Sequence, residues 1–192
     1  QTRGITRVTV ANSGDVGVGI TPTTRNNTRL QIVDGIGFPS TQVASTDPNT
    51  LDDYEEGIWT PVLTASTTPP DSVTYGASLQ TGTYTKIGRL VFFEGIIGLT
   101  GFTLGAGAGD LVVSGLPFAT RGNEGSVQRV QVTVWLGSVD LSTGTLYVNG
   151  QLFSGDAKLV FQEIKDNAAT TSILISAISP SSGIRVMGQY NV

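Results

Sequence analysis

The clearest structural signal in the chain is the segment Gln128-Arg129-Val130-Gln131-Val132-Thr133-Val134-Trp135-Leu136. From Val130 onward every second residue is apolar, which is the period of a β-strand with one face against a core. The intervening side chains of Gln131, Thr133 and Trp135 then lie on the outer face. Trp135 is the unusual member, because a large exposed indole is costly unless something contacts it.

Similar strand signals recur from residue 59 onward, and no segment has the 3.6-residue period of a long helix. The segment from Arg89 to Leu99 is apolar on both faces, so we expect a core on one face and a second sheet or a neighbouring subunit on the other. The pair Asn149-Gly150 predicts a hairpin turn, since such turns need residues that tolerate positive φ. The expected fold is all-β, an antiparallel, jelly-roll-like β-sandwich. The other predicted strands are Trp59 to Ala65, Thr83 to Lys86, Asp110 to Ser114, Thr145 to Val148, Gln151 to Ser154, Lys158 to Ile164, Ser172 to Ile178 and Gly183 to Val192.

Composition excludes several classes of function. The 192 residues carry a formal net charge of −4 and no basic cluster, so we expect no nucleic-acid partner. Cysteine and histidine are both absent, which removes disulfides, thiolate sites, Ser-His-Asp triads and the commonest metal ligand. No apolar run reaches the length of a membrane span, so no membrane insertion is expected. We also expect no cofactor.

Residues 1–50 differ from the rest. They contain short strand-like pieces around Val8 and Val10, around Gly14 to Ile20, and at Leu30 to Val33, with glycines at the bends. Such pieces cannot hide their apolar faces alone, but they are stable when wound around identical copies. The stretch from Pro39 to Thr50 is rich in Ser, Thr, Asp and Pro. We therefore expect a fibrous β-stalk and linker over 1–50 and a globular β-domain over 51–192.

Three segments of the first half carry distinctive motifs. They are Gly14-Asp15-Val16-Gly17-Val18-Gly19-Ile20-Thr21-Pro22 followed by Arg29-Leu30-Gln31-Ile32, then Phe38-Pro39-Ser40-Thr41-Gln42 through Asn49-Thr50-Leu51-Asp52-Asp53-Tyr54-Glu55-Glu56-Gly57-Ile58-Trp59-Thr60-Pro61, then Gly82-Thr83-Tyr84-Thr85-Lys86-Ile87-Gly88-Arg89-Leu90-Val91. The first resembles the Gly-rich motif of phage fibre stalks, the second the junction found in many tail fibres and tailspikes, and the third a strand that recurs after that junction.

The resemblance implies a homotrimer in the virion, with the C-terminal domain at the tip of a tail fibre or tailspike. The expected partners are two identical subunits and a host-surface polysaccharide or lipopolysaccharide. Low charge and many hydroxyl and amide groups suit carbohydrate. Two alternatives stay open at this point: a trimerisation clamp that binds no ligand, and a polysaccharide depolymerase with carboxylates shared between subunits.

The candidate carbohydrate site follows from the outward indole. Sugars present flat C–H faces that pack on aromatic rings, and hydroxyls that bond to amides and carboxylates. Trp135, Gln131 and Asp140 can supply both kinds of contact, and Tyr147 with Asn149 form a second group of candidates. Burial of Trp135 under a loop or a subunit contact is the structural alternative. Tyr75 is a weaker candidate in a predicted loop, and the apolar flank of Trp59 places that indole in the core.

Acidic residues provide the candidates for chemistry. The run of four acids at 52, 53, 55 and 56 could serve glycoside hydrolysis or bind calcium. We expect instead a solvated junction, because neighbouring acids repel one another and no apolar pocket is evident to raise a pKa. A depolymerase would draw on Asp140, Asp156, Glu124 or Glu163. The preferred expectation is a binding module that is not an enzyme.

Overall fold

A computed structural model describes residues 8–11, 16–18, 30–32, 36–38, 50–51, 53–122, 130–153 and 155–192. The chain forms two compact units, Gln1–Thr41 and Gln42–Val192. In the first unit, β1 (Val8–Val10) pairs antiparallel with β2 (Val16–Val18), and β3 (Leu30–Ile32) pairs parallel with β2. These short strands lie where the sequence predicts them; the stalk and linker roles of residues 1–50 stay predictions.

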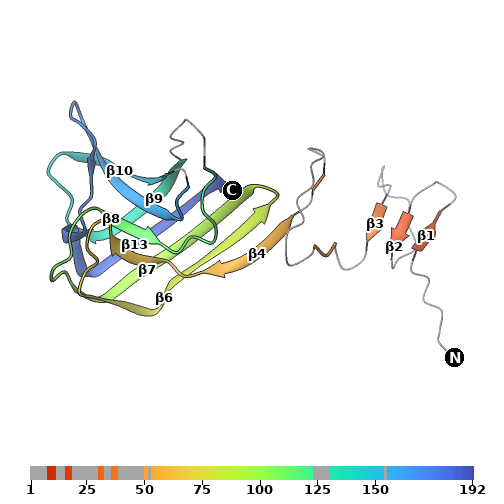
Figure 1. Ribbon diagram of the computed structural model, residues 1–192, viewed down its shortest axis with the longest axis horizontal. Coiled ribbons are helices and arrows are strands. Elements are labelled where there is room, and N and C mark those ends of the chain that lie inside the picture. The colour runs from red at the N-terminus through yellow and green to blue at the C-terminus, as the bar shows by residue number, and fades with distance from the viewer. Residues whose placement is uncertain are drawn as a thin grey trace. The chain divides into compact units, whose positions relative to one another are not determined.

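The second unit is one curled antiparallel sheet (Figure 1). Its strand order is β4-β6-β7-β13-β9-β10-β11-β8-β5, with β12 paired to β11. Strands β4 and β5 lie at opposite ends of this order, yet only Thr60 and Pro61 separate them in the chain, so the sheet curls until its two ends meet. The strands are β4 (Tyr54–Trp59), β5 (Val62–Ala65), β6 (Ser72–Ile87), β7 (Leu90–Thr103), β8 (Leu111–Ser114), β9 (Val130–Val139), β10 (Thr145–Leu152), β11 (Lys158–Lys165), β12 (Thr171–Ser172) and β13 (Ile178–Asn191).

The all-β prediction is confirmed, since the helical structure in the described ranges is the single 3₁₀ turn η1 (Ile175–Ala177). Within those ranges there is no helix long and apolar enough to cross a bilayer. The concave side of the curled sheet encloses one apolar core. Its fully buried members include Phe161, Leu159, Leu152, Ile184 and Tyr190.

The strand alternation predicted around Trp135 is confirmed. In β9, Val132 is buried while Gln131 and Thr133 are exposed. In β7 the side chain of Phe93 enters the core, whereas that of its neighbour Phe92 lies on the outer face. The outer face of these strands is therefore a surface separate from the core, and it carries both polar and apolar groups.

The hairpin predicted at Asn149-Gly150 is wrong. Both residues lie inside β10, where Gly150 pairs with Val132 on one side and Phe161 on the other. A Cβ added at Gly150 would lie 2.6 Å from Cγ2 of Val134, so glycine is there for close packing rather than for a turn. Positive-φ glycines flank the strand instead, at Gly144 and Gly155.

Three other strand predictions need correction. The predicted strand from Trp59 to Ala65 is two strands, because the chain passes from one end of the sheet to the other at Pro61. Strand β6 begins at Ser72, so Tyr75 lies in a strand, and its hydroxyl accepts a hydrogen bond from the Leu63 amide at 3.0 Å. The segment from Ser172 to Ile178 is not one strand: it contains the end of β12, the turn η1 and the start of β13, and its amides bond to several different elements.

Candidate functional site

The outer faces of β6, β7, β13 and β9 form a continuous surface. Cross-strand register places side chains in two neighbouring rows on it. One row runs Thr83, Glu94, Met187 and Thr133; the other runs Thr81, Ile96, Arg185 and Trp135. These eight side chains come from strands that span residues 72 to 191 of the chain.

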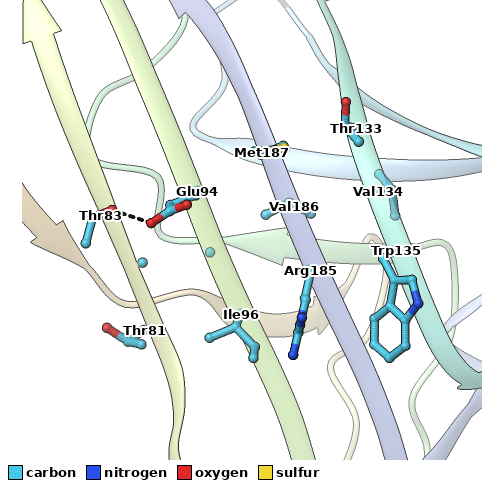
Figure 2. Close-up of a pocket in the computed structure, with 12 residues that line it drawn as sticks. Thr81, Thr83, Glu94, Ile96, Thr133, Val134, Trp135, Arg185, Val186 and Met187 are labelled. Atoms are coloured by element: carbon cyan, nitrogen blue, oxygen red, sulfur yellow. Dashed lines mark hydrogen bonds between the residues drawn. The ribbon is translucent and has the colours of Figure 1, made fainter.

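A hollow of about 460 Å³ lies over these rows (Figure 2). That size falls in the range of small-molecule sites, about 300–1,000 Å³. Its lining combines apolar groups, threonine hydroxyls, one acid and one base. Figure 2 shows Glu94 directed toward Thr83, whose hydroxyl donates to it at 3.1 Å, while Arg185 is directed to the end that holds Ile96 and Trp135.

Trp135 is positioned by glycines. Its side chain is 56% exposed. A Cβ at Gly137 would lie 2.5 Å from Cη2 of the indole, and one at Gly183 would lie 3.2 Å from Cζ3. Gly137 and Gly183 are cross-strand partners, so together they leave room for the indole to lie over the sheet. The sequence analysis does not predict this pair. Gly137 could have been noticed, because it follows Trp135 by two residues and therefore lies on the same face of the strand.

Arg185 lies beside the indole. Its guanidinium carbon is 5.5 Å from the Trp135 ring centroid, which is a cation–π geometry. The ion pairs formed within the described part of the chain involve other bases, and none includes Arg185. The site therefore offers a flat aromatic ring next to a positive charge that no carboxylate of these residues neutralises.

A second hollow of about 510 Å³ adjoins the first. Both are lined by Thr83, Glu94, Thr133 and Met187, so they form one groove along the outer face. Gln131 and Gln189 line the second hollow and add amide groups. The structure thus brings Trp135 and Gln131 to the same groove, as the sequence predicts.

The other predicted site residues lie elsewhere. Tyr147 and Asn149 belong to β10 and line neither hollow; Tyr147 is exposed, and it is not at a hairpin tip. Asp140 follows β9 and lines a separate polar pocket of about 660 Å³. Asp140 is therefore separated from Trp135 and Gln131, with which the sequence groups it, and the second group of candidates lies on another surface, because register and strand ends rather than sequence proximity set the neighbours.

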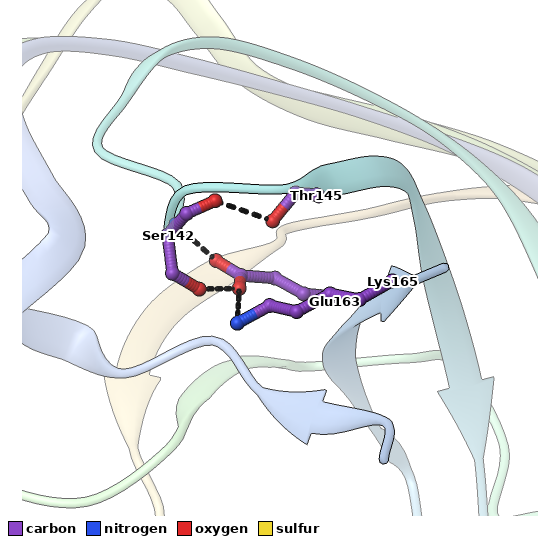
Figure 3. Close-up of polar contacts among 4 residues, drawn as sticks. All are labelled: Ser142, Thr145, Glu163 and Lys165. Atoms are coloured by element: carbon purple, nitrogen blue, oxygen red, sulfur yellow. Dashed lines mark hydrogen bonds and ion pairs between the residues drawn. The ribbon is translucent and has the colours of Figure 1, made fainter. Parts of the chain in front are cut away.

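The polar pocket contains a buried acid (Figure 3). Glu163 accepts hydrogen bonds from the Ser142 amide, at 2.9 Å, and from the Ser142 hydroxyl, and it lies 3.6 Å from Nζ of Lys165. The Thr145 hydroxyl donates to the Ser142 carbonyl at 2.8 Å. These contacts hold the loop between β9 and β10 in place, so the Glu163 carboxylate has a structural role.

Of the other acids considered for catalysis, one shares this pocket and one lies elsewhere. Asp140 lines the same pocket as Glu163, whereas Asp156 pairs with Lys158 at 3.4 Å. Glu124 lies outside the described residues. Across the described ranges, no three His, Cys, Asp or Glu side chains gather in a way that could hold a metal ion.

The acidic run is a solvated junction only in part, because Glu55 and Glu56 are exposed whereas Asp53 is not. Asp53 is buried and forms an ion pair with Lys86. Glu55 accepts a hydrogen bond from the Tyr84 hydroxyl, and this bond raises the pKa of Tyr84 to about 12. Glu56 accepts from Tyr54, whose pKa is raised by that bond. Asp52 lies outside the described residues.

Trp59, which the sequence places in the core, is buried there. The indole is 4% exposed and donates a hydrogen bond of 2.8 Å to the Glu94 carbonyl. It also meets the ring of Phe93 edge-on at 6.1 Å. This tryptophan therefore contributes to stability and is not available to a ligand.

Comparison with known proteins finds one structure with a similar fold among those that match. The fold is similar to part of the crystal structure of the Dettilon tailspike protein (gp208), with a TM-score of 0.56 and 16% sequence identity. The likeness covers 72% of this chain and 24% of the tailspike chain, so it extends over about a quarter of that protein. No protein-family model and no curated protein sequence matches the chain. At this identity the likeness concerns the fold, and the all-β architecture is one that a phage tailspike also contains.

Proposed function

We propose that the chain is a module of a bacteriophage tail fibre or tailspike, located in the virion at the tip, that assembles as a homotrimer and binds host-surface polysaccharide or lipopolysaccharide. The observation that carries the proposal is the exposed Trp135, laid over a glycine pair in a groove lined by hydroxyl, amide and charged groups. The indole can pack against the flat C–H face of a sugar ring, and the neighbouring polar groups can form hydrogen bonds with the hydroxyls of the sugar. Three such sites on one trimer would bind a repeating polymer with avidity.

We expect Trp135→Ala to weaken sugar binding roughly tenfold per site, because the variant loses the flat apolar surface on which a sugar ring packs. The measurement is surface plasmon resonance of the full chain on a panel of immobilised bacterial polysaccharides and lipopolysaccharides. Tyr147→Ala is the matched control, since it removes an exposed aromatic ring that does not line the groove.

Loss of binding with Tyr147→Ala but not with Trp135→Ala would move the site to β10. A well-folded wild-type trimer that binds no member of the panel would favour the assembly clamp. Release of reducing ends from a bound polysaccharide would favour the depolymerase. We propose that the chain binds polysaccharide without cleaving it. In support, the Glu163 carboxylate is already bonded to Ser142 and paired with Lys165.

The homotrimer requires a contact surface. Three large, mainly apolar side chains are exposed on the outer face at β4 and its neighbour β6, at one end of the strand order. We call Tyr54, Ile58 and Ile87 the edge patch. Ile58 is 76% exposed, the largest value among the exposed hydrophobic residues of the described ranges. Contact through the edge patch leaves the Trp135 end of the groove open. Within each subunit, we propose that the curled sheet forms the two layers of a β-sandwich.

Ile58→Asp is expected to weaken trimer association at least tenfold, because it places a charge in an apolar contact. Multi-angle light scattering should give about three times the 20.0 kDa chain mass for the wild type and a lower mass for the variant. Leu146→Asp changes a similarly exposed apolar residue on β10 and should leave the mass unchanged. A wild-type mass near 20.0 kDa would contradict the trimer, and an unaffected Ile58→Asp trimer would contradict the edge patch.

A further inference from the structure

The groove is electrostatically asymmetric. Of the residues that line its two hollows, Arg185 is the base and Glu94 is the acid. The acid is hydrogen-bonded to Thr83 and lies in the neighbouring row, while the base is exposed in the row of Trp135. The Trp135 end of the groove is therefore positive, although the chain as a whole carries −4.

Arg185 also contacts the indole. Its guanidinium is 5.5 Å from the Trp135 ring centroid, and a guanidinium next to an aromatic ring still presents N–H donors at its edge. Those donors form a planar fork that matches a carboxylate. A sugar ring in contact with the indole therefore lies within reach of the fork.

We propose that the groove selects an acidic sugar, a hexuronate whose ring packs on Trp135 and whose carboxylate pairs with Arg185. This inference rests on the proposed carbohydrate-binding function and adds the chemical class of the ligand. The Glu94 carboxylate repels a negatively charged group, so the groove accepts a ligand carboxylate only at the end near Arg185. The carboxylate oxygens of Glu94 can also accept hydrogen bonds from sugar hydroxyls. A hexuronate carries a single carboxylate on an otherwise neutral ring, which fits this division of charge.

The test uses matched sugars that differ only in the carboxylate. The 192-residue chain labelled with 5-fluorotryptophan gives two fluorine resonances, one from exposed Trp135 and one from buried Trp59 as an internal control. It is titrated with methyl β-D-glucuronide against methyl β-D-glucoside, and with methyl α-D-galacturonide against methyl α-D-galactoside. From the shift of the Trp135 resonance, we expect the acidic sugar of at least one pair to have a dissociation constant about fivefold lower than its neutral counterpart. This factor is typical of a partly exposed ion pair.

Three variants identify the source of the preference. Arg185→Gln should remove the preference for the acidic sugar. Arg185→Lys should keep part of this preference, because an ammonium retains the charge but lacks the planar pair of N–H donors. Lys158→Gln removes one positive charge from a residue that does not line the groove and should leave the preference intact.

Equal affinity within both sugar pairs, a preference that survives in Arg185→Gln, or no shift of the Trp135 resonance with any of the four sugars would each overturn the inference. The proposed function is judged separately by the polysaccharide panel. Trp135-dependent binding to neutral polysaccharides would leave that function standing and show that the acidic ligand class was wrong.

Discussion

Lys86→Met should lower the free energy of unfolding by about 3–5 kcal/mol, because it leaves the Asp53 carboxylate buried without its ammonium. The two side chains of this ion pair are 5% and 7% exposed, so water cannot take over the lost contact. The Lys86 ammonium also lies 5.6 Å from the Phe118 ring centroid. Urea unfolding followed by circular dichroism, at one fixed protein concentration, gives the measurement.

The double variant Asp53→Leu/Lys86→Met separates the cost of a stranded charge from the value of the pair. Replacing both buried partners by apolar groups is often close to neutral. We therefore expect the double variant to recover most of the stability lost in Lys86→Met. A double variant as unstable as the single one would show that packing around Lys86, rather than the buried charge, dominates.

Trp59→Ala is expected to cost about 3–5 kcal/mol, since it empties a large buried site and removes the indole that donates to the Glu94 carbonyl. The site is shaped for this ring: a Cβ at Gly95 would lie 2.6 Å from Cζ2 of Trp59, and its three nearest neighbours are all indole atoms. The same unfolding measurement applies to this variant.

Gly95→Ala supplies the control. In the wild type the added methyl meets the indole, so we expect a loss of about 1–3 kcal/mol. In the Trp59→Ala background the methyl enters the space that the ring has left, and its effect should fall to near zero or become favourable. Purely additive effects of the two substitutions would contradict this account of the glycine.

Much of the fold can be predicted from local alternation. The exposure of Trp135 and the burial of Val132 follow from the two-residue period of β9. The apolar residues on both faces of β7 predict two covers, and in the single chain only the face that carries Phe93 is covered, while Phe92 is exposed. The prediction fails where long-range packing outweighs local preference. Gly150 looks like a turn residue next to Asn149, yet it lies between Val132 and Phe161, where a side chain has no room.

The candidate site could be predicted only in part for a related reason. Trp135 and Gln131 share one strand, so their common face can be read directly from the sequence. Arg185 and Glu94 reach the groove from β13 and β7, and which residue lies opposite Trp135 depends on strand register. A shift of one residue in β13 would have placed Val186 or Ile184 there instead.

The position of β13 also bears on how the domain is made. This strand lies between β7 and β9, in the middle of the sheet order, although it comes last of the strands along the chain. During synthesis on the ribosome, the strands up to β7 and those from β9 onward therefore have no central partner until residues 178–191 have emerged. Such non-local pairing slows folding and leaves strand edges open meanwhile. The sheet of the nascent domain can therefore close only after nearly all of the residues of its strands have been translated.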